Sequence, residues 1–172
     1  HSSAVEPNEA RFAVPPAAAM RLTPPEAVPL PRASHGMDLV TLEQVAKLSS
    51  AGIIVSIGHS DADFETATAY ISAGARCVTH LFNAMSQLGN REPGLVGATL
   101  AHGGVHAGVI ADGFHVHSET MRVALRAKTG LGKIHLVTDA MSTVGSDIQS
   151  FALNGREIRR AGGRLTLADG TL

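Results

Sequence analysis

Short apolar segments alternate with helical patterns from residue 41 onward, and this alternation limits the possible folds more than any other feature of the sequence. Buried parallel strands read as nearly continuous apolar runs, and strand–helix alternation at this spacing indicates parallel βαβ units. We therefore expect an α/β fold built on a parallel sheet. The expected strands are 52–57, 77–79, 105–110 and 134–138, and helices are expected over 42–48, 63–73 and 118–128.

The two ends of the chain depart from this alternation. Residues 1–36 hold seven of the eight prolines and a run of alanines, without a period of 2 or 3.6. This composition predicts an irregular segment over 1–36 and a folded domain over 37–172. Near the C-terminus, the apolar–polar patterns at 151–160 and 164–167, joined through Gly162-Gly163, predict a β-hairpin.

Composition narrows the classes of function. The formal net charge of −1 offers no basic surplus to neutralise the phosphates of a nucleic acid. No apolar run reaches the roughly 20 residues that span a bilayer, and no signal-peptide pattern opens the sequence. Cys77 is the single cysteine, which excludes an internal disulfide framework. We expect a cytoplasmic protein that binds neither nucleic acid nor membrane.

Polar side chains follow the expected strands at the point where each strand ends. His59 and His80 follow the first two strands, Asp112 and His115 follow the third, and Asp139 follows the fourth. In a (β/α)₈ barrel the active site is built from such strand ends at the carboxyl face. An open doubly wound sheet binds its ligands at the same ends, so the pattern alone leaves both architectures possible.

The types of these residues suggest metal-assisted hydrolysis of an amide. Neutral imidazoles such as His59 and His80 suit zinc or iron, and an aspartate near a metal-activated water can move protons. Asp139 is placed for that work. Structural alternatives stay open: a single histidine at a strand end is more often a hydrogen-bonding residue, Asp139 could cap the next segment, and Arg91 could be a solvated loop charge.

Five segments together resemble the N-acetylglucosamine-6-phosphate deacetylase family of the amidohydrolase superfamily, in order, from about residue 37 to the end. The resemblance implies a partial (β/α)₈ TIM-like barrel that uses a divalent metal, zinc or iron(II). The segments are Gly58-His59-Ser60, Thr79-His80-Leu81-Phe82-Asn83-Ala84-Met85, Arg91-Glu92-Pro93-Gly94, Ala111-Asp112-Gly113-Phe114-His115 and Val137-Thr138-Asp139-Ala140.

The same resemblance implies a role for each matching residue. His59 and His80 correspond to metal ligands, Arg91 to a phosphate-binding arginine, and Asp139 to the catalytic acid and base. His115 would contact the sugar or polarise the acetamido carbonyl. The family is typically homodimeric, and its substrate is a small sugar phosphate. The expected substrate-binding residues are Asn83, Ala84, Arg91, Asp112, Gly113, Phe114 and His115.

The sequence also departs from the family. The third metal ligand of the family is a glutamate in a His-x-Glu-Gly-Pro stretch, which does not occur in this chain. A whole barrel needs about 250 residues, and this chain has 172. We therefore expect a fragment with little or no deacetylase activity by itself. The alternatives are a remnant that binds sugar phosphate or assists assembly, and an amidohydrolase for another N-acyl sugar.

Overall fold

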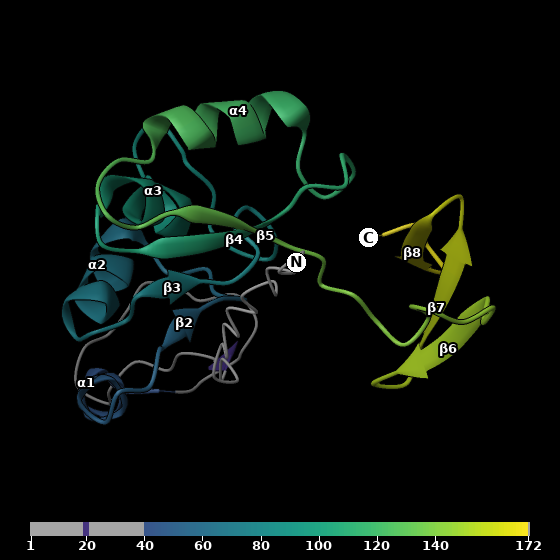
Figure 1. Cartoon of the computed structure of the whole chain (residues 1–172), viewed down its shortest axis with the longest axis horizontal. Helices are drawn as coiled ribbons and strands as arrows, with labels where there is room; N and C mark the ends of the chain where they lie inside the picture. The colour runs from purple at the N-terminus through teal and green to yellow at the C-terminus, as the bar shows by residue number, and fades with distance from the viewer. Residues whose placement is uncertain (1–18, 21–39, 172) are drawn as a thin grey trace, which may run out of the picture.

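The computed structural model describes residues 19–20 and 40–171 of the chain. It is a mixed α/β structure in which a parallel βα layer precedes a small antiparallel sheet (Figure 1). The elements are β1 (Ala19–Met20), α1 (Leu42–Ser50), β2 (Ser56–Ile57), α2 (Phe64–Ser72), β3 (Cys77–Val78), α3 (Gly94–Ala101), β4 (His106–Ile110), α4 (Ser118–Ala127), β5 (Ile134–Val137), β6 (Ser150–Leu153), β7 (Arg156–Ala161) and β8 (Arg164–Leu167).

The first sheet has five parallel strands in the order β1-β2-β3-β4-β5, so each strand pairs with the next one along the chain. Ile57 pairs with Val78, and Val78 pairs with Ala107. The helices contact one another in the same order, α1 with α2, α2 with α3 and α3 with α4. A sheet that grows in one direction, with crossover helices in one layer, leaves the carboxyl ends of its strands as neighbours at one edge.

Local sequence explains where the first two helices begin. The Thr41 hydroxyl accepts a hydrogen bond from the Gln44 amide at 3.2 Å, and the Gln44 side chain accepts one from the Thr41 amide at 2.8 Å. This is the expected capping box, in which two unpaired backbone donors are satisfied reciprocally. At the start of α2 the Asp63 carboxylate accepts from the Thr66 amide at 2.8 Å. Both helices confirm the sequence prediction.

Helix α3 was not predicted from the sequence. Its residues Gly94 to Leu100 are all buried, so its sequence lacks the polar stripe by which a surface helix is recognised. The buried Thr99 hydroxyl finds its hydrogen-bond partner within the helix, because it donates to the Leu95 carbonyl at 2.7 Å. A helix of this kind reads as an undivided apolar run, and periodicity cannot distinguish it from a strand.

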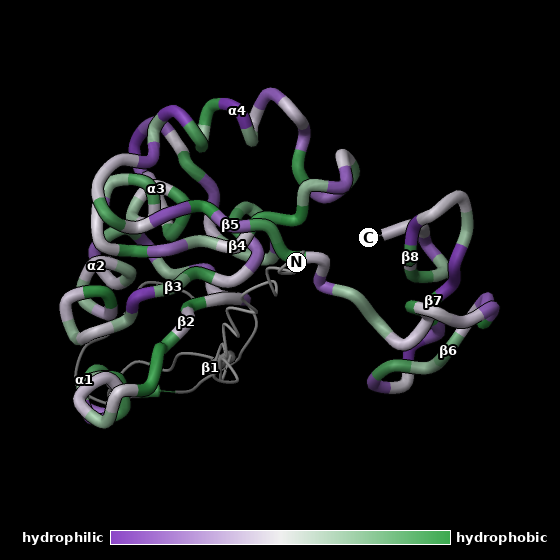
Figure 2. The backbone as a smooth tube through the Cα atoms, viewed as in Figure 1, coloured by the Kyte–Doolittle hydropathy of each residue, from purple (hydrophilic) through white to green (hydrophobic). Residues whose placement is uncertain are grey.

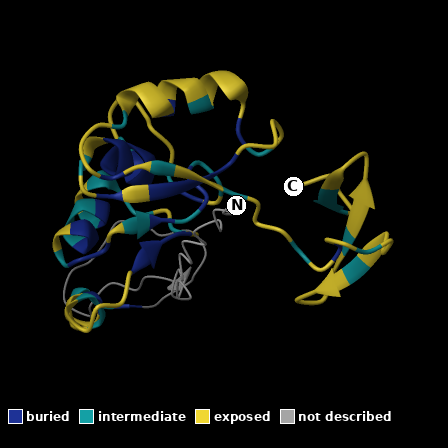
Figure 3. Ribbon diagram, viewed as in Figure 1, coloured by how far each residue is buried: buried dark blue, intermediate teal, exposed yellow. Residues whose placement is uncertain are grey.

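One hydrophobic core lies between the parallel sheet and its helices (Figure 3). Aliphatic side chains fill it, and Tyr70 is the one aromatic residue in the buried part of the cluster. The largest fully buried side chains of the described residues are Ile57, Leu81, Leu95, Val45, Val55, Val78, Val96, Val105 and Val109, together with Thr99.

The C-terminal strands form a three-stranded antiparallel sheet in the order β6-β7-β8, one strand more than the expected hairpin. The segment 151–160, expected as one strand, is broken at Asn154 and Gly155. Both adopt positive φ, at 50° and 75°, as a tight hairpin turn requires. Most residues of this sheet are exposed, and polar and apolar residues are mixed along its strands (Figure 2).

Several element boundaries also differ from the prediction. The first expected strand, 52–57, is reduced to Ser56–Ile57, because Ile53 and Ile54 are 41% and 49% exposed and lie outside the ladder. Strand β1 lies within the segment expected to be irregular, and residues 1–18 and 21–36 of that segment lie outside the described residues. No helix in the described part of the chain is long and apolar enough to cross a membrane.

Candidate functional site

His59 and His80 lie side by side at the ends of β2 and β3. Their Nε2 atoms are 2.9 Å apart, and the two rings meet edge to face with centroids separated by 4.7 Å. His80 is 4% exposed, whereas His59 is exposed. Both residues have positive φ, 49° and 29°. Non-glycine residues adopt this conformation rarely, and such strain is concentrated at functional positions.

The approach of β2 to β3 brings the two imidazoles together. A Cβ atom at Gly58 would lie 2.9 Å from the Thr79 Cβ atom, so no larger residue fits before His59 without a shift. Two residues earlier, in β2, the Ser56 hydroxyl bonds the Thr79 hydroxyl at 2.7 Å. These contacts fix the two strand ends against each other, and the histidines that follow the strands converge.

The donor atoms of this pair suit a divalent cation. A zinc ion bound by two imidazoles at about 2.0–2.1 Å needs their nitrogens only slightly farther apart than the two Nε2 atoms are. The buried Nδ1 atom of His80 has no hydrogen-bond partner within the described residues, which is costly in a folded protein. Two imidazoles fit zinc or iron(II). The described residues contain no group of three possible metal ligands.

The loop after His80 is tightly folded back on itself. Phe82 and Ala84 have positive φ, 79° and 48°. The side-chain amide of Asn83 donates to the carbonyls of His80 and Leu81 at 3.4 Å each. Asn83 is half-buried and Ala84 is exposed, so the expected substrate contacts lie immediately beside the histidine pair.

Arg91 lies in an exposed loop that leads into α3. The loop is closed by a hydrogen bond from the Gly89 amide to the Glu92 carbonyl at 2.9 Å. Gly94, with a φ of 62°, starts the helix, and a Cβ atom there would lie 2.8 Å from the Gln87 carbonyl oxygen. The sequence predicts a functional role for Arg91, but it does not predict that Ser86 and Glu92 hold the loop in which Arg91 lies.

Asp112 and His115 form a second group, at the end of β4. The Asp112 Oδ2 atom is 2.7 Å from His115 Nδ1, and Oδ1 accepts from the amides of Phe114 and His115 at 2.8 and 2.9 Å. Desolvation pushes the pKa of Asp112 upward, but these hydrogen bonds outweigh it and hold the pKa below its ordinary value. A charged Asp112 therefore orients the His115 ring.

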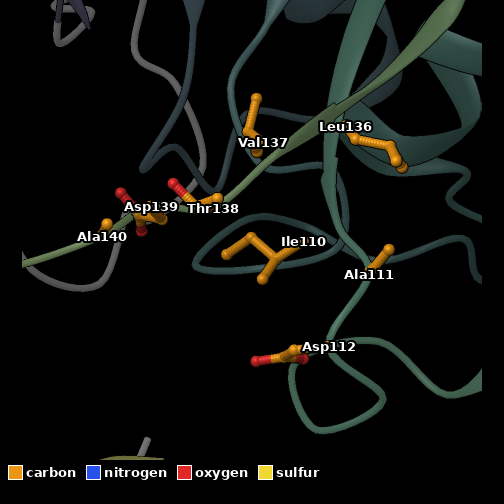
Figure 4. Close-up of a pocket in the computed structure, with 8 residues that line it drawn as sticks. All are labelled: Ile110, Ala111, Asp112, Leu136, Val137, Thr138, Asp139 and Ala140. Atoms are coloured by element: carbon orange, nitrogen blue, oxygen red, sulfur yellow. The ribbon is translucent and has the colours of Figure 1, made fainter. Parts of the chain in front are cut away.

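Asp112 and Asp139 line one open pocket of about 820 Å³ between the ends of β4 and β5 (Figure 4). Asp139 has a φ of 49°, as His59 does. The structure thus brings the predicted residues together as a His59–His80 pair and an Asp112–His115 pair, with Asp139 in the same pocket as Asp112. Neither His59 nor His80 lines this pocket. The pocket is lined by Ile110, Ala111, Asp112, Leu136, Val137, Thr138, Asp139 and Ala140.

Phe114 links this second group to the C-terminal sheet. The guanidinium carbon of Arg164, at the start of β8, lies 3.8 Å from the centre of the Phe114 ring. A cation over an aromatic face at this distance is attracted by the ring quadrupole. Sequence reasoning gave no role to Arg164, because nothing local predicts a contact between residues fifty positions apart.

Three of the four remaining described histidines have structural contacts. His117 caps α4 by accepting a hydrogen bond from the Glu119 amide, His102 bonds the Thr68 hydroxyl, and His106 accepts from the Lys133 amide. A histidine pair and two carboxylates therefore stand out at the carboxyl ends of successive parallel strands. That arrangement defines the class of protein: a parallel α/β domain with a candidate ligand site at its strand ends.

Similarity to known proteins gives the family. No profile of a known protein family matches the chain. The chain is 48% identical to N-acetylgalactosamine-6-phosphate deacetylase of Shewanella sp. (strain ANA-3), over 76% of this chain and 32% of that protein. It is 40% identical to N-acetylglucosamine-6-phosphate deacetylase of Bacillus subtilis (strain 168), over 76% of this chain and 33% of that protein.

Solved structures agree with these matches. N-acetylglucosamine-6-phosphate deacetylase from Pasteurella multocida aligns with a TM-score of 0.71 and 37% identity, over 76% of this chain and 34% of that chain. A mutant of the Mycobacterium smegmatis enzyme in complex with N-acetyl-D-glucosamine-6-phosphate aligns with a TM-score of 0.68 and 33% identity, over 74% of this chain and 33% of that chain. The resemblance to the N-acetylglucosamine-6-phosphate deacetylase family is therefore confirmed, and the chain is a homologue of these enzymes. It spans about a third of the length of the relatives it matches.

Proposed function

We propose that the whole protein removes the N-acetyl group of N-acetylglucosamine 6-phosphate, giving glucosamine 6-phosphate and acetate. The observation that carries this proposal is the convergence of the His59 and His80 imidazoles at the ends of neighbouring parallel strands, with Nε2 atoms 2.9 Å apart. Asp112 and Asp139 line a pocket at the ends of the next two strands. The names of the related proteins support a phosphorylated N-acetyl sugar as substrate.

The architecture that we propose is a partial (β/α)₈ barrel over residues 37–172, to which β1 (Ala19–Met20) adds a strand at the edge. Its strand order runs β1-β2-β3-β4-β5 without a reversal. A doubly wound sheet reverses its strand order at the ligand site, whereas a barrel adds each strand beside the previous one. The strand order thus favours the barrel. The expected homodimer rests on the family resemblance, and the expected cytoplasmic location rests on the composition of the sequence; both belong to the same proposal.

His59 and His80 would hold a zinc or iron(II) ion in the proposed enzyme. Such an ion supplies Lewis acidity, which lowers the pKa of a water molecule and polarises a carbonyl group. Metal binding requires both imidazoles to be neutral at the coordinating nitrogen, so affinity would fall as the pH falls. A third ligand would come from outside the described residues.

Asp139 would move the protons of the reaction. Its carboxylate takes a proton from the attacking water, whose oxygen bonds to the acetyl carbon. The C–N bond then breaks, and Asp139 returns the proton to the departing amine. Its exposed position at the mouth of the pocket leaves room for a substrate between Asp139 and the β4 loop.

His115 would stabilise the negative charge that develops on the acetyl oxygen. The Asp112 carboxylate accepts a hydrogen bond from Nδ1, which fixes the ring and leaves Nε2 to face the substrate. To donate to the oxyanion while Nδ1 donates to Asp112, the His115 ring would carry a proton on both of its nitrogens. Asn83, Ala84, Gly113 and Phe114 would contact the sugar, and their positions beside the two groups support this.

Arg91 would bind the 6-phosphate. A guanidinium presents a fixed fork of donors that matches phosphate oxygens, as a lysine does not. Arg91 is exposed and makes no ion pair within the described residues, so its charge is available to an anionic ligand. Arg91→Ala would raise the KM of the whole enzyme for the phosphorylated sugar far more than for the unphosphorylated one.

A second substrate, N-acetylgalactosamine 6-phosphate, is favoured by one observation. The chain is more similar to the Shewanella N-acetylgalactosamine-6-phosphate deacetylase, at 48%, than to the Bacillus subtilis N-acetylglucosamine-6-phosphate enzyme, at 40%. The two sugars differ only in the configuration of one hydroxyl. Acetate release by the whole protein from each sugar phosphate, measured side by side, decides between them.

Metal content tests the carrying observation directly. The purified 172-residue chain, incubated with zinc or ferrous iron and desalted, should retain metal that His59→Ala and His80→Ala each reduce. His135→Ala, a change in a histidine outside the pair, is the matched control and should leave the metal content unchanged. Equal retention by all variants would contradict the metal site. We expect little or no acetate release from the isolated chain, and robust turnover would contradict that expectation.

A further inference from the structure

The carboxylate of Glu92 joins the starts of two helices. One oxygen, Oε1, accepts a hydrogen bond from the Phe64 amide at 2.7 Å and another from the Gly94 amide at 2.8 Å. Phe64 is the first residue of α2, and Gly94 is the first residue of α3. The first amides of a helix have no partner within the helix, and its amino end favours negative charge. Glu92 thus satisfies two such amides at once.

Ser86 makes a parallel connection between the same two regions. Its hydroxyl donates to the Ala62 carbonyl and accepts from the Leu95 amide at 2.8 Å. Ser86 also receives a hydrogen bond from the Val96 amide at its carbonyl, at 3.3 Å. Ser86 and Glu92 therefore clamp the loop between them onto the segment that follows His59, at both ends of the loop.

Arg91 lies inside this clamped loop, next to Glu92. The Glu92 carboxylate is occupied by backbone amides, and no ion pair joins it to the adjacent guanidinium in the described residues. An acidic neighbour that paired with Arg91 would neutralise the charge that a phosphate needs. Here the acidic neighbour instead fixes the backbone and leaves the guanidinium exposed.

We propose that Glu92 is a positioning residue for Arg91, because its two backbone hydrogen bonds hold the arginine loop in a fixed relation to the His59 segment. This inference rests on the proposed function, in which Arg91 binds the phosphate of the substrate. Glu92 does not touch the ligand. Its effect passes through the α2 and α3 amino ends, and it sets the distance between the phosphate site and the histidine pair.

The first test is amide hydrogen exchange of the 172-residue chain. Glu92→Ala should speed exchange at Phe64 and Gly94 by roughly tenfold or more, since a hydrogen bond to a charged group is lost at each. Glu92→Gln keeps an oxygen acceptor and should give a smaller increase. Glu65→Ala is the matched control, because Glu65 lies in the first turn of α2 without a side-chain hydrogen bond in the described residues. Unchanged exchange in Glu92→Ala would overturn the inference.

The second test measures, by nuclear magnetic resonance titration, how tightly the same chain binds N-acetylglucosamine 6-phosphate and N-acetylglucosamine. Wild type should prefer the phosphorylated sugar, and Glu92→Ala should reduce that preference about as much as Arg91→Ala. In the double variant that carries both Arg91→Ala and Glu92→Ala, the preference for the phosphorylated sugar should be no lower than in Arg91→Ala alone. A role only in folding predicts equal losses for both sugars, and that result would overturn the inference.

The two proposals fail in different ways. If Arg91→Ala weakens phosphate-dependent binding and Glu92→Ala does not, the positioning role is wrong and the proposed substrate stands. If wild type shows no preference for the phosphorylated sugar, the phosphate role of Arg91 is wrong, and the positioning role falls with it. Hydrogen exchange then still shows whether Glu92 holds the loop.

Discussion

The region up to β4 and the region from β5 onward carry different parts of the candidate site and are held in different ways. His59 and His80 follow strands that lie in the buried core, and the loops after them are tied by Ser86 and Glu92. Asp139 follows β5, whose Leu136 is 74% exposed, and the core cluster contains no residue of β6–β8. The two histidines proposed as metal ligands are thus fixed by the fold of this chain, while the proposed proton-moving carboxylate follows a poorly covered strand.

The largest expected difference is between two leucines of these regions. Leu81 is 0% exposed, and Leu81→Ala should lower the free energy of unfolding by about 2–5 kcal/mol, because it opens a cavity. Leu136→Ala should change it by about 0.5 kcal/mol or less, because its side chain is largely in water. Urea denaturation of both variants measures the difference. Equal losses would show that β5 is as well packed as the first strands.

A smaller effect is expected at Gly58, where β2 and β3 approach each other. A methyl group there would lie 2.9 Å from the Thr79 Cβ atom, so Gly58→Ala should cost about 1–3 kcal/mol of unfolding free energy and separate the two histidines. Zinc retention should fall with it. Gly104→Ala is the control, because an added Cβ atom there meets nothing within 4 Å. A Gly58→Ala variant as stable and as metal-binding as the control would refute the close approach.

How much of the fold and site the sequence could predict depends on whether the signal is local in the chain. The strand ends with His59, His80, Asp112 and Asp139 were found because a buried parallel strand leaves an apolar run followed by a polar residue, all within a few positions. The capping residues Thr41 and Asp63 are equally local. Helix α3 was missed because it is buried on all sides and has no polar stripe.

Long-range contacts were beyond sequence reasoning. The bond from the Phe64 amide to Glu92 spans 28 positions, and the contact of Arg164 with Phe114 spans fifty. Whether such residues meet depends on how the helices and sheets pack, which no local pattern records. The extra strand in the C-terminal sheet is a different case. Asn154-Gly155 is a recognisable turn signal in the sequence and could have been used.

Protonation of Asp112 should give a modest, pH-dependent effect in the loop that follows β4. Its pKa is lower in the folded chain than in the unfolded chain, so its contribution to stability is complete above the unfolded value of about 3.9. That contribution is lost as the pH falls through the folded value. Asp112→Asn should therefore lower stability at pH 7 by less than about 1 kcal/mol, since the carboxylate is partly exposed and screened.

Urea denaturation at pH 7 and at pH 2.5 (about one unit or more below the unfolded value) measures this dependence. The difference between Asp112→Asn and wild type should shrink at the acidic pH. Asp147→Asn is the control, because Asp147 is exposed and its side chain makes no hydrogen bond in the described residues. A difference that grows on acidification would mean that the carboxylate is not stabilised in its charged form.

The smallest expected effect concerns the contact between the two regions. Arg164 lies over the Phe114 ring at 3.8 Å, and an exposed cation–π contact is worth about 0.5–1 kcal/mol. Arg164→Ala should therefore barely change global stability, but it should shift the ring resonances of Phe114 and speed amide exchange in the loop over residues 113–115. Arg156→Ala, a change in the neighbouring strand β7, should do neither. If both variants leave Phe114 unchanged, the C-terminal sheet does not rest on the β4 loop. In that case, the Asp112–His115 pair is held by its own hydrogen bonds alone.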